Sequence, residues 1–205
     1  MNTNLSACQE LTPEDIDRDT VEAAAITYLE GYLWDPPKAK EAFREASRIA
    51  HGAGRKVAIT LSDSFCVDRY RDEFLELARS RVVDIVFANE HEAKALYQTS
   101  DLDTALGLLE GDVPLAVVTL GEAGSVVSAR GERVRVPIAA AEQVVDLTGA
   151  GDLYAAGFLA GLAGNLPYQA CGALGSIAAA EVISHIGARP RASLKGLAEQ
   201  HGIGI

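Results

Sequence analysis

The residues best suited to chemistry lie in one short turn, Gly149-Ala150-Gly151-Asp152. Glycine lets the backbone approach a ligand closely and adopt φ values that other residues avoid. Because the turn opens a segment with a helical pattern, its unpaired N–H groups could bind an anion, helped by the helix dipole. A carboxylate repels phosphate, so Asp152 makes sense there if it accepts a proton from an attacking hydroxyl. The turn therefore predicts phosphoryl transfer, which needs positioning, charge neutralisation and a base.

A simpler interpretation of the same turn is a helix start, with Asp152 near the cap and the glycines there for flexibility. Two other phosphate-binding signatures do not fit. Tyr154 stands where the third glycine of a dinucleotide-binding G-x-G-x-x-G would be, which disfavours a dehydrogenase. No G-x-x-x-x-G-K-[ST] occurs, so the chemistry is not that of a P-loop.

Two further polar segments follow apolar runs that have the pattern of strands. Asn89 and Glu92 follow one of them, and Thr119, Gly121 and Gly124 follow another. Taken alone, Asn89 would cap the next helix and Glu92 would complement its dipole. Thr119 and Gly121 alone would be a strand end and a turn.

Together these segments resemble three motifs of the ribokinase-like (PfkB) carbohydrate and nucleoside kinases. Residues 146–152 resemble D-T-x-G-A-G-D, with Leu147 where the family usually has threonine. Residues 89–92 resemble N-x-x-E, and residues 119–124 resemble T-x-G-x-x-G. The motifs follow the family's order, and the resemblance extends from about residue 24 to residue 188. Residues 29–32, 61–65 and 87–93 resemble the adenosine kinase branch.

The resemblance implies ATP and Mg²⁺ as cofactors and a sugar or nucleoside, adenosine-like, as the acceptor. It implies that Asp152 is the catalytic base and that the amides of Gly149, Ala150 and Gly151 form the anion hole for the γ-phosphate. The implied nucleotide-binding residues are Asn89, Glu92, Thr119, Gly121, Gly124 and Ser176, with Ser176 against the adenine and Glu92 also holding Mg²⁺ through water. Asp146 and Thr148 match positions that hold a monovalent cation, possible K⁺ ligands, in some members.

The elements that must position these residues alternate between strand and helix, which predicts an α/β fold with a mostly parallel sheet. Strands are expected at residues 24–29, 56–61, 83–88 and 115–119, and an antiparallel hairpin at 124–129 and 132–138. Helices are expected at residues 38–51, 67–78, 90–97, 102–109, 150–163, 167–183 and 194–200, and a charged surface helix at 10–19. The resemblance implies one ribokinase-like domain over residues 1–205, with three α/β/α layers.

The helix expected after the turn is rich in alanine and glycine. Each glycine costs roughly 1 kcal/mol of helix propensity relative to alanine, so close packing against the sheet is the predicted reason for them. The uncharged run of residues 153–180 is long enough for a membrane span. Asn165-Leu166-Pro167 interrupts it, so two buried helices are predicted instead.

Composition excludes several classes of function. The chain has 205 residues, a net charge of −11 and 48% hydrophobic residues, which argues against a disordered chain. The acidic balance argues against nucleic acid and anionic membrane as partners. Residues 1–12 lack the apolar core of a signal peptide, and Cys8, Cys66 and Cys171 form no C-x-x-C pair. A cytoplasmic protein without disulfides is therefore predicted.

The chain is also shorter than members of the family. The resemblance leaves out the early strands, the small β lid and the acidic residue that grips the sugar hydroxyls. We therefore expect a truncated kinase with weak or no activity alone. A fragment of a longer protein and a non-catalytic nucleotide-binding or interaction module on the same fold remain alternatives. An exposed sheet favours self-association, so a homodimer also stays open.

Overall fold

The computed structural model describes residues 6–204. The first five residues of the segment expected to lack a signal peptide lie outside this range. Six strands pair in the order β1-β2-β3-β4-β5-β6. They are β1 (Ile26–Glu30), β2 (Lys56–Thr60), β3 (Ile85–Asn89), β4 (Leu115–Thr119), β5 (Ser125–Ala129) and β6 (Glu132–Val136). Strand β2 is parallel to both β1 and β3. The predicted α/β architecture with parallel strands is confirmed.

Tertiary packing divides the chain into two compact units, which are described separately below. The first unit runs through Val117 and adds residues 129–131, and the second comprises residues 118–128 and those from 132 onward. The first holds α1 (Arg18–Ala23), α2 (Pro37–Gly52), α3 (Ser64–Arg79), α4 (Glu90–Tyr97) and α5 (Leu102–Asp112). The second holds α6 (Ala150–Ala163), α7 (Tyr168–Ile183) and α8 (Leu194–Gln200). The single domain implied by the resemblance stays a prediction.

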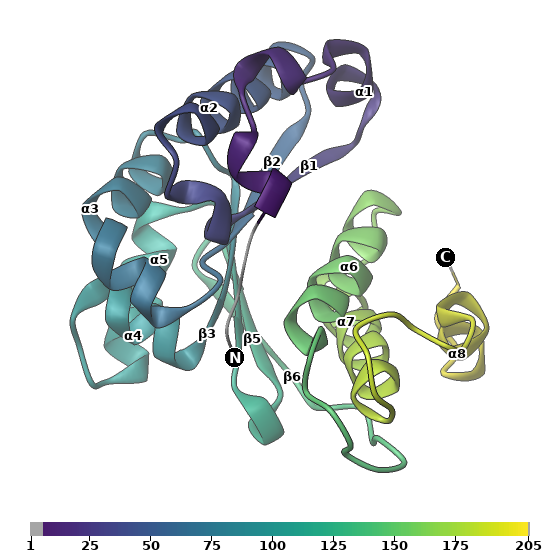
Figure 1. Ribbon diagram of the computed structural model, residues 1–205. Helices are drawn as coiled ribbons and strands as arrows, with labels where there is room; N and C mark the ends of the chain where they lie inside the picture. The colour runs from purple at the N-terminus through teal and green to yellow at the C-terminus, as the bar shows by residue number, and fades with distance from the viewer. Residues whose placement is uncertain (1–5, 205) are drawn as a thin grey trace. The chain divides into compact units, whose positions relative to one another are not determined.

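The core of the first unit forms where helices cover parallel strands. Strand β2 buries Val57, Ala58 and Ile59 in succession, as expected for a strand covered on both faces. Helix α2 packs against β1 and β2, and α4 packs against β3 (Figure 1). This packing fixes the carboxyl ends of β1, β2 and β3, where polar residues follow.

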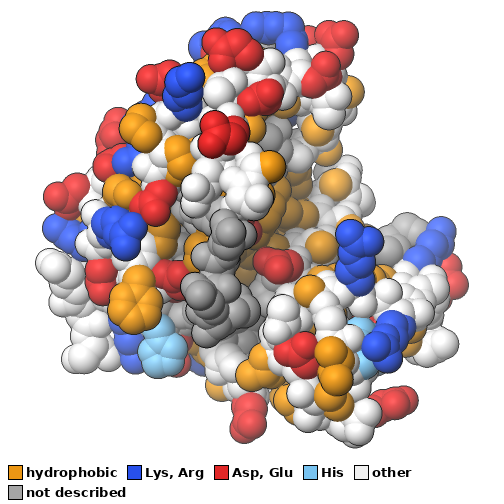
Figure 2. Space-filling view, viewed as in Figure 1, with side chains coloured by type: hydrophobic (Ala, Val, Ile, Leu, Met, Phe, Trp, Pro, Cys, Tyr) orange, Lys and Arg blue, Asp and Glu red, His pale blue; other side chains and the backbone are white. Residues whose placement is uncertain are grey.

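On the face seen in Figure 2, acidic and basic side chains are interspersed rather than gathered by sign.

The surface helix expected at residues 10–19 is not formed as one element, so that prediction is wrong. Two 3₁₀ turns, Ser6–Glu10 and Pro13–Asp15, precede α1, which begins only at Arg18. The carboxylate of Asp15 accepts the amide of Thr12 at 2.9 Å and closes the second turn. Asp17 then caps α1 by accepting the amide of Thr20 at 2.7 Å. Such local side-chain bonds compete with helix continuation.

The predicted hairpin of β5 and β6 is confirmed. Arg130 and Gly131 join the two strands with φ of 54° and 82°. Positive φ at both central residues is the pattern of a type I′ turn, whose twist matches that of antiparallel strands.

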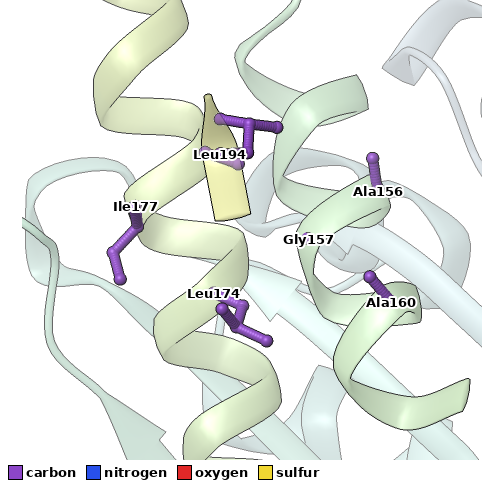
Figure 3. Close-up of a pocket in the computed structure, with 7 residues that line it drawn as sticks. Ala156, Gly157, Ala160, Leu174, Ile177 and Leu194 are labelled. Carbon is purple, nitrogen blue, oxygen red and sulfur yellow. The ribbon is translucent and has the colours of Figure 1, made fainter. Parts of the chain in front are cut away.

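The two helices predicted for the uncharged run are also confirmed, since α6 ends at Ala163 and α7 begins at Tyr168. Gly157 and Gly161 of α6 lie against α7 and not against the sheet, which corrects the packing predicted for α6. A Cβ on Gly157 would lie 2.5 Å from the carbonyl oxygen of Leu174, and one on Gly175 would lie 2.7 Å from that of Tyr154. Only glycine permits this approach. Figure 3 shows the two helices beside a small apolar cavity of about 100 Å³. Among residues 6–204, no helix has the length and hydropathy of a membrane span.

Candidate functional site

The glycine turn lies in the second unit, where α6 begins. Gly149 is the N-cap of α6 and has a φ of +85°. A Cβ at this position would lie 2.9 Å from the Cβ of Ala188, so both the backbone angle and the space require glycine. Asp146 braces the turn on both sides. Its Oδ1 accepts the amide of Thr148 at 3.0 Å, and its Oδ2 accepts that of Gly187 at 3.1 Å.

The predicted anion hole of three amides needs one correction. The amide of Ala150 donates to the carbonyl of Leu147 at 3.2 Å and closes the turn. Within residues 6–204, neither Gly149 nor Gly151 donates its N–H to an acceptor. Two of the three predicted donors are therefore open to a ligand, because the first amides of a helix have no partner inside it.

Asp152 lies in the first turn of α6 and is exposed. In the described part of the chain its carboxylate takes part in no hydrogen bond or ion pair. A carboxylate with free oxygens stands directly after two free amides, so this helix start can bind an anion and accept a proton. The plain capping interpretation does not account for Asp152, since Gly149 is the cap.

The predicted cation ligands, Asp146 and Thr148, lie together at this turn. Hydrogen bonds to the Asp146 carboxylate lower its pKa, those from the Thr148 side chain and amide first and that from the Gly187 amide after them. Asp146 is therefore a structural brace of the turn, and a monovalent cation beside it stays a prediction.

The N-x-x-E segment lies in the first unit, where β3 passes into α4. Asn89 and Glu92 cap each other. The amide of Glu92 donates to Asn89 Oδ1 at 2.9 Å, and the amide of Asn89 donates to Glu92 Oε2 at 2.9 Å. Asn89 Nδ2 donates to Glu92 Oε1 at 2.6 Å. The capping interpretation of Asn89 is confirmed, and it also holds Glu92 in one orientation.

Glu92 is only 4% exposed, and it lies near two further acids that the sequence-based site had left out. Burial raises its pKa to about 7, against the hydrogen bond from Asn89, and the charges of Asp63 and Glu30 raise it further. Glu30 ends β1 and accepts a hydrogen bond from Ser62, and Asp63 caps α3. Their position at the carboxyl ends of parallel strands was the signal available in the sequence.

This acidic region suits Mg²⁺ in its chemistry, because carboxylate oxygens are the ligands Mg²⁺ prefers and a cation would relieve the mutual repulsion. Among residues 6–204, however, no three His, Cys, Asp or Glu side chains lie close enough to hold a metal directly. Mg²⁺ commonly keeps several waters and binds through few carboxylates. The residues therefore fit a water-mediated site, and Glu92 as its ligand stays a prediction.

Glu92 gives a prediction for stability as a function of pH. Its folded pKa of about 7 exceeds the ordinary 4.5, so the folded chain binds more protons within this window. The free energy of unfolding should therefore fall as pH rises from 4.5 to 7. Glu92→Gln removes this titration. Urea unfolding measures the free energy of unfolding of both proteins. We expect the value for the variant, relative to that of the wild type, to rise by up to about 3 kcal/mol between pH 4.5 and pH 7.5. Equal pH dependence of both proteins would contradict the raised pKa.

A cavity of about 240 Å³ lies in the first unit beside Asp63 and is lined by aromatic and polar side chains. Phe65 is 81% exposed, although it is a large apolar side chain. Burial and the neighbouring Asp63 raise the pKa of Tyr32 to about 12, so its hydroxyl stays a donor. Burial also raises the pKa of Cys66 to about 12, which excludes a reactive thiolate there.

The T-x-G-x-x-G segment follows the end of β4 in the second unit. Gly121 has a φ of +59°, is exposed and has open space around it. Gly124 has φ +87° and ψ −130°, and its Cβ would lie 2.1 Å from the carbonyl oxygen of Val136. Gly121 is therefore accessible to a ligand and Thr119 is half-buried, whereas Gly124 serves the packing of the backbone.

Ser176, expected against the adenine, is buried in α7. Its Oγ accepts the amide of Ala139 at 2.6 Å. This placement ties the segment after β6 to α7, and nothing in it favours contact with a base.

With this geometry established, comparison with known proteins identifies the family. Residues 1–194 match the pfkB family of carbohydrate kinases. The chain belongs to this family. This membership confirms the family resemblance of the three sequence motifs.

The relatives include nucleoside kinases. The chain is 35% identical to a cytidine kinase of Thermococcus kodakarensis over 65% of this chain and 49% of that one. It is 32% identical to an adenosine kinase of Saccharomyces cerevisiae over 78% of this chain and 50% of that one. The chain thus spans about half the length of the curated relatives it matches.

Among solved structures, an adenosine kinase from Sinorhizobium meliloti has a TM-score of 0.93 and 60% identity, covering 95% of this chain and 60% of that one. A probable sugar kinase from Rhizobium etli CFN 42 has a TM-score of 0.94 and 54% identity, covering 96% of this chain and 59% of that one. The likeness to the Sinorhizobium meliloti protein supports the adenosine kinase branch indicated by the sequence, and both likenesses confirm the predicted ribokinase-like fold.

Proposed function

We propose that this chain carries the ATP-binding and catalytic part of a nucleoside kinase, which transfers the γ-phosphate of ATP to a hydroxyl of the nucleoside. The observation that carries the proposal is the start of α6, where the N–H groups of Gly149 and Gly151 and the carboxylate of Asp152 have no hydrogen-bond partner among the described residues. The amides bind the transferring phosphoryl group and stabilise its charge. Asp152 accepts the hydroxyl proton as the oxygen attacks phosphorus and the bond to ADP breaks.

The remaining predicted residues take supporting parts. Half-buried Thr119, at the end of β4, and exposed Gly121 after it would contact the ATP phosphates and ribose. Mg²⁺, when bound, would neutralise phosphate charge, and Glu92 would hold it through water. Asn89 fixes the orientation of Glu92 by the capping bonds.

The cavity beside Asp63 supports a nucleoside as the acceptor over a simple sugar. The exposed phenyl ring of Phe65, which lines this cavity as Tyr32 does, offers a surface on which a base can stack. The carboxylates of Asp63 and Glu30 can accept hydrogen bonds from ribose hydroxyls. The adenosine and cytidine kinases among the relatives agree with this acceptor class.

Three parts of the proposal rest on the sequence alone. A monovalent cation such as K⁺ would lie beside Asp146 and Thr148. The protein would function in the cytoplasm, and it would associate as a homodimer, without nucleic acid or membrane as a partner.

The decisive assay compares this chain with a longer one, completed by the part of the Sinorhizobium meliloti adenosine kinase that it does not match. Each is incubated with ATP, Mg²⁺ and adenosine, cytidine or ribose. We expect the completed chain to phosphorylate nucleosides at roughly 1–100 per second, and this chain alone far more slowly. The completed chain should use ribose poorly, since ribose lacks a base.

Two outcomes would contradict the proposal. Binding of ATP without transfer by the completed chain would favour a non-catalytic nucleotide-binding module. Turnover by this chain alone at the full rate would refute the expectation that it needs further residues.

A further inference from the structure

Glu181 holds the segment that follows α7. It lies in the last turn of α7, and its side chain is 8% exposed. One carboxylate oxygen, Oε1, accepts the amides of Arg191 at 2.8 Å and Ala192 at 2.9 Å, and lies 3.3 Å from His185 Nε2. This oxygen therefore ties both ends of residues 185–192 to one point.

The tied segment is the one that supports the glycine turn. The amide of Gly187 donates to Asp146, and Ala188 lies against Gly149, where a Cβ would come within 2.9 Å of it. The residues before the turn are tied to the end of α7, where the segment begins, since the amide of Val145 donates to the carbonyl of Ile183 at 2.8 Å. A shift of residues 185–192 would therefore move the brace of Gly149.

The way Glu181 is buried argues for a role beyond packing. Burial raises its pKa, but the amides of Ala192 and Arg191 and the contact with His185 outweigh this, so the net pKa is lowered and the carboxylate is ionised. Within residues 6–204 its other oxygen, Oε2, is buried without a hydrogen-bond partner. An apolar side chain would avoid the cost of desolvating this oxygen. What it could not do is hold the two backbone amides.

We propose that Glu181 is a positioning residue for the phosphate-binding turn, acting through residues 185–192 on Asp146 and Gly149. That the turn binds the phosphate of ATP rests on the proposed function, whereas the contacts that connect Glu181 to the turn do not. The two can therefore fail separately.

The test compares Glu181→Ala and Glu181→Gln with the wild type, using Glu199→Ala as a control for loss of an exposed glutamate in α8. Amide NMR signals of Gly149, Gly151 and Gly187 report the turn without any ligand. Titration with Mg-ATP then gives the dissociation constant. We expect Glu181→Ala to shift or broaden these signals and to raise the dissociation constant about tenfold, a typical loss when support of a binding group is removed.

Glu181→Gln keeps an acceptor oxygen for the two amides, so it should stay within about twofold of the wild type. If Glu181 only stabilised the fold, Glu181→Ala would not change the turn signals selectively while Glu181→Gln kept both the signals and the ATP affinity of the wild type. Should Glu181→Ala fail to fold, Glu181→Asp takes its place, because the shorter side chain keeps the charge but cannot reach both amides. If the amide signals of the turn in Glu181→Ala, or in Glu181→Asp where that variant replaces it, match those of Glu199→Ala, the inference is overturned.

The outcomes also separate the two proposals. If the wild type binds no ATP while the turn signals respond to Glu181, the proposed function fails and the positioning role stands. If ATP binds and the turn signals do not change when Glu181 is replaced, the positioning role fails and the proposed function stands.

Discussion

Replacing Asp152 by asparagine should lower the rate of phosphoryl transfer about a thousandfold while leaving the affinity for ATP unchanged or slightly higher. General-base catalysis contributes about 10²- to 10⁴-fold in enzymes, and an amide cannot accept the hydroxyl proton. Binding should not suffer, because Asp152→Asn removes a negative charge from the vicinity of the phosphates. The side chain is exposed, so the exchange should not disturb the fold.

The measurement uses the chain completed with the adenosine kinase part, with and without the substitution. Steady-state rates with adenosine give the loss of transfer, and titration with Mg-ATP gives affinity. Glu199→Gln is a matched control, since Glu199 is also exposed in the second unit but lies in α8, outside the turn and the predicted nucleotide-binding segments. A variant that keeps more than a tenth of the wild-type rate would remove Asp152 from the role of base.

Gly124→Ala should destabilise the protein by about 3 to 5 kcal/mol, the largest effect on stability that we expect from a single added methyl group. The backbone angles, φ +87° and ψ −130°, are ones that only glycine adopts readily. The new Cβ would also lie 2.1 Å from a backbone oxygen, that of Val136. Strain and overpacking each cost about 1–3 kcal/mol. Urea unfolding followed by circular dichroism measures the loss.

Gly121→Ala provides the comparison within the same motif. Gly121 also has a positive φ, +59°, but its Cβ would meet no atom within 4 Å. A left-handed conformation alone costs about 1–2 kcal/mol, so the loss should be clearly smaller. If both variants lose equal stability, the contact with Val136 does not set the requirement for Gly124.

Local patterns predicted most of the fold. The apolar runs that became β2, β3 and β4 were recognisable because strands covered on both faces are apolar nearly throughout. The break between α6 and α7 was visible in Asn165 and Pro167, of which Asn165 adopts a φ of 59°. The exception was the segment before α1, where short-range bonds of Asp15 and Asp17 replaced the periodic helix.

The candidate site was predictable only in part, since motifs report residue types and not partners. Asp152 and the glycines stand where the sequence placed them, but the bond of Ala150 to Leu147 depends on turn geometry. The same holds for Ser176, whose partner Ala139 is distant in sequence. Glu181 carries no motif at all, because its function depends on two backbone amides of a folded loop.

The central claim is that the terminal phosphate of ATP binds at the start of α6, in front of Asp152. A crystal structure of the chain with Mg²⁺ and a non-hydrolysable ATP analogue tests it most directly. The account predicts phosphate oxygens within about 2.7–3.1 Å of the Gly149 and Gly151 nitrogens. A nucleotide bound with its terminal phosphate away from these two amides would contradict it.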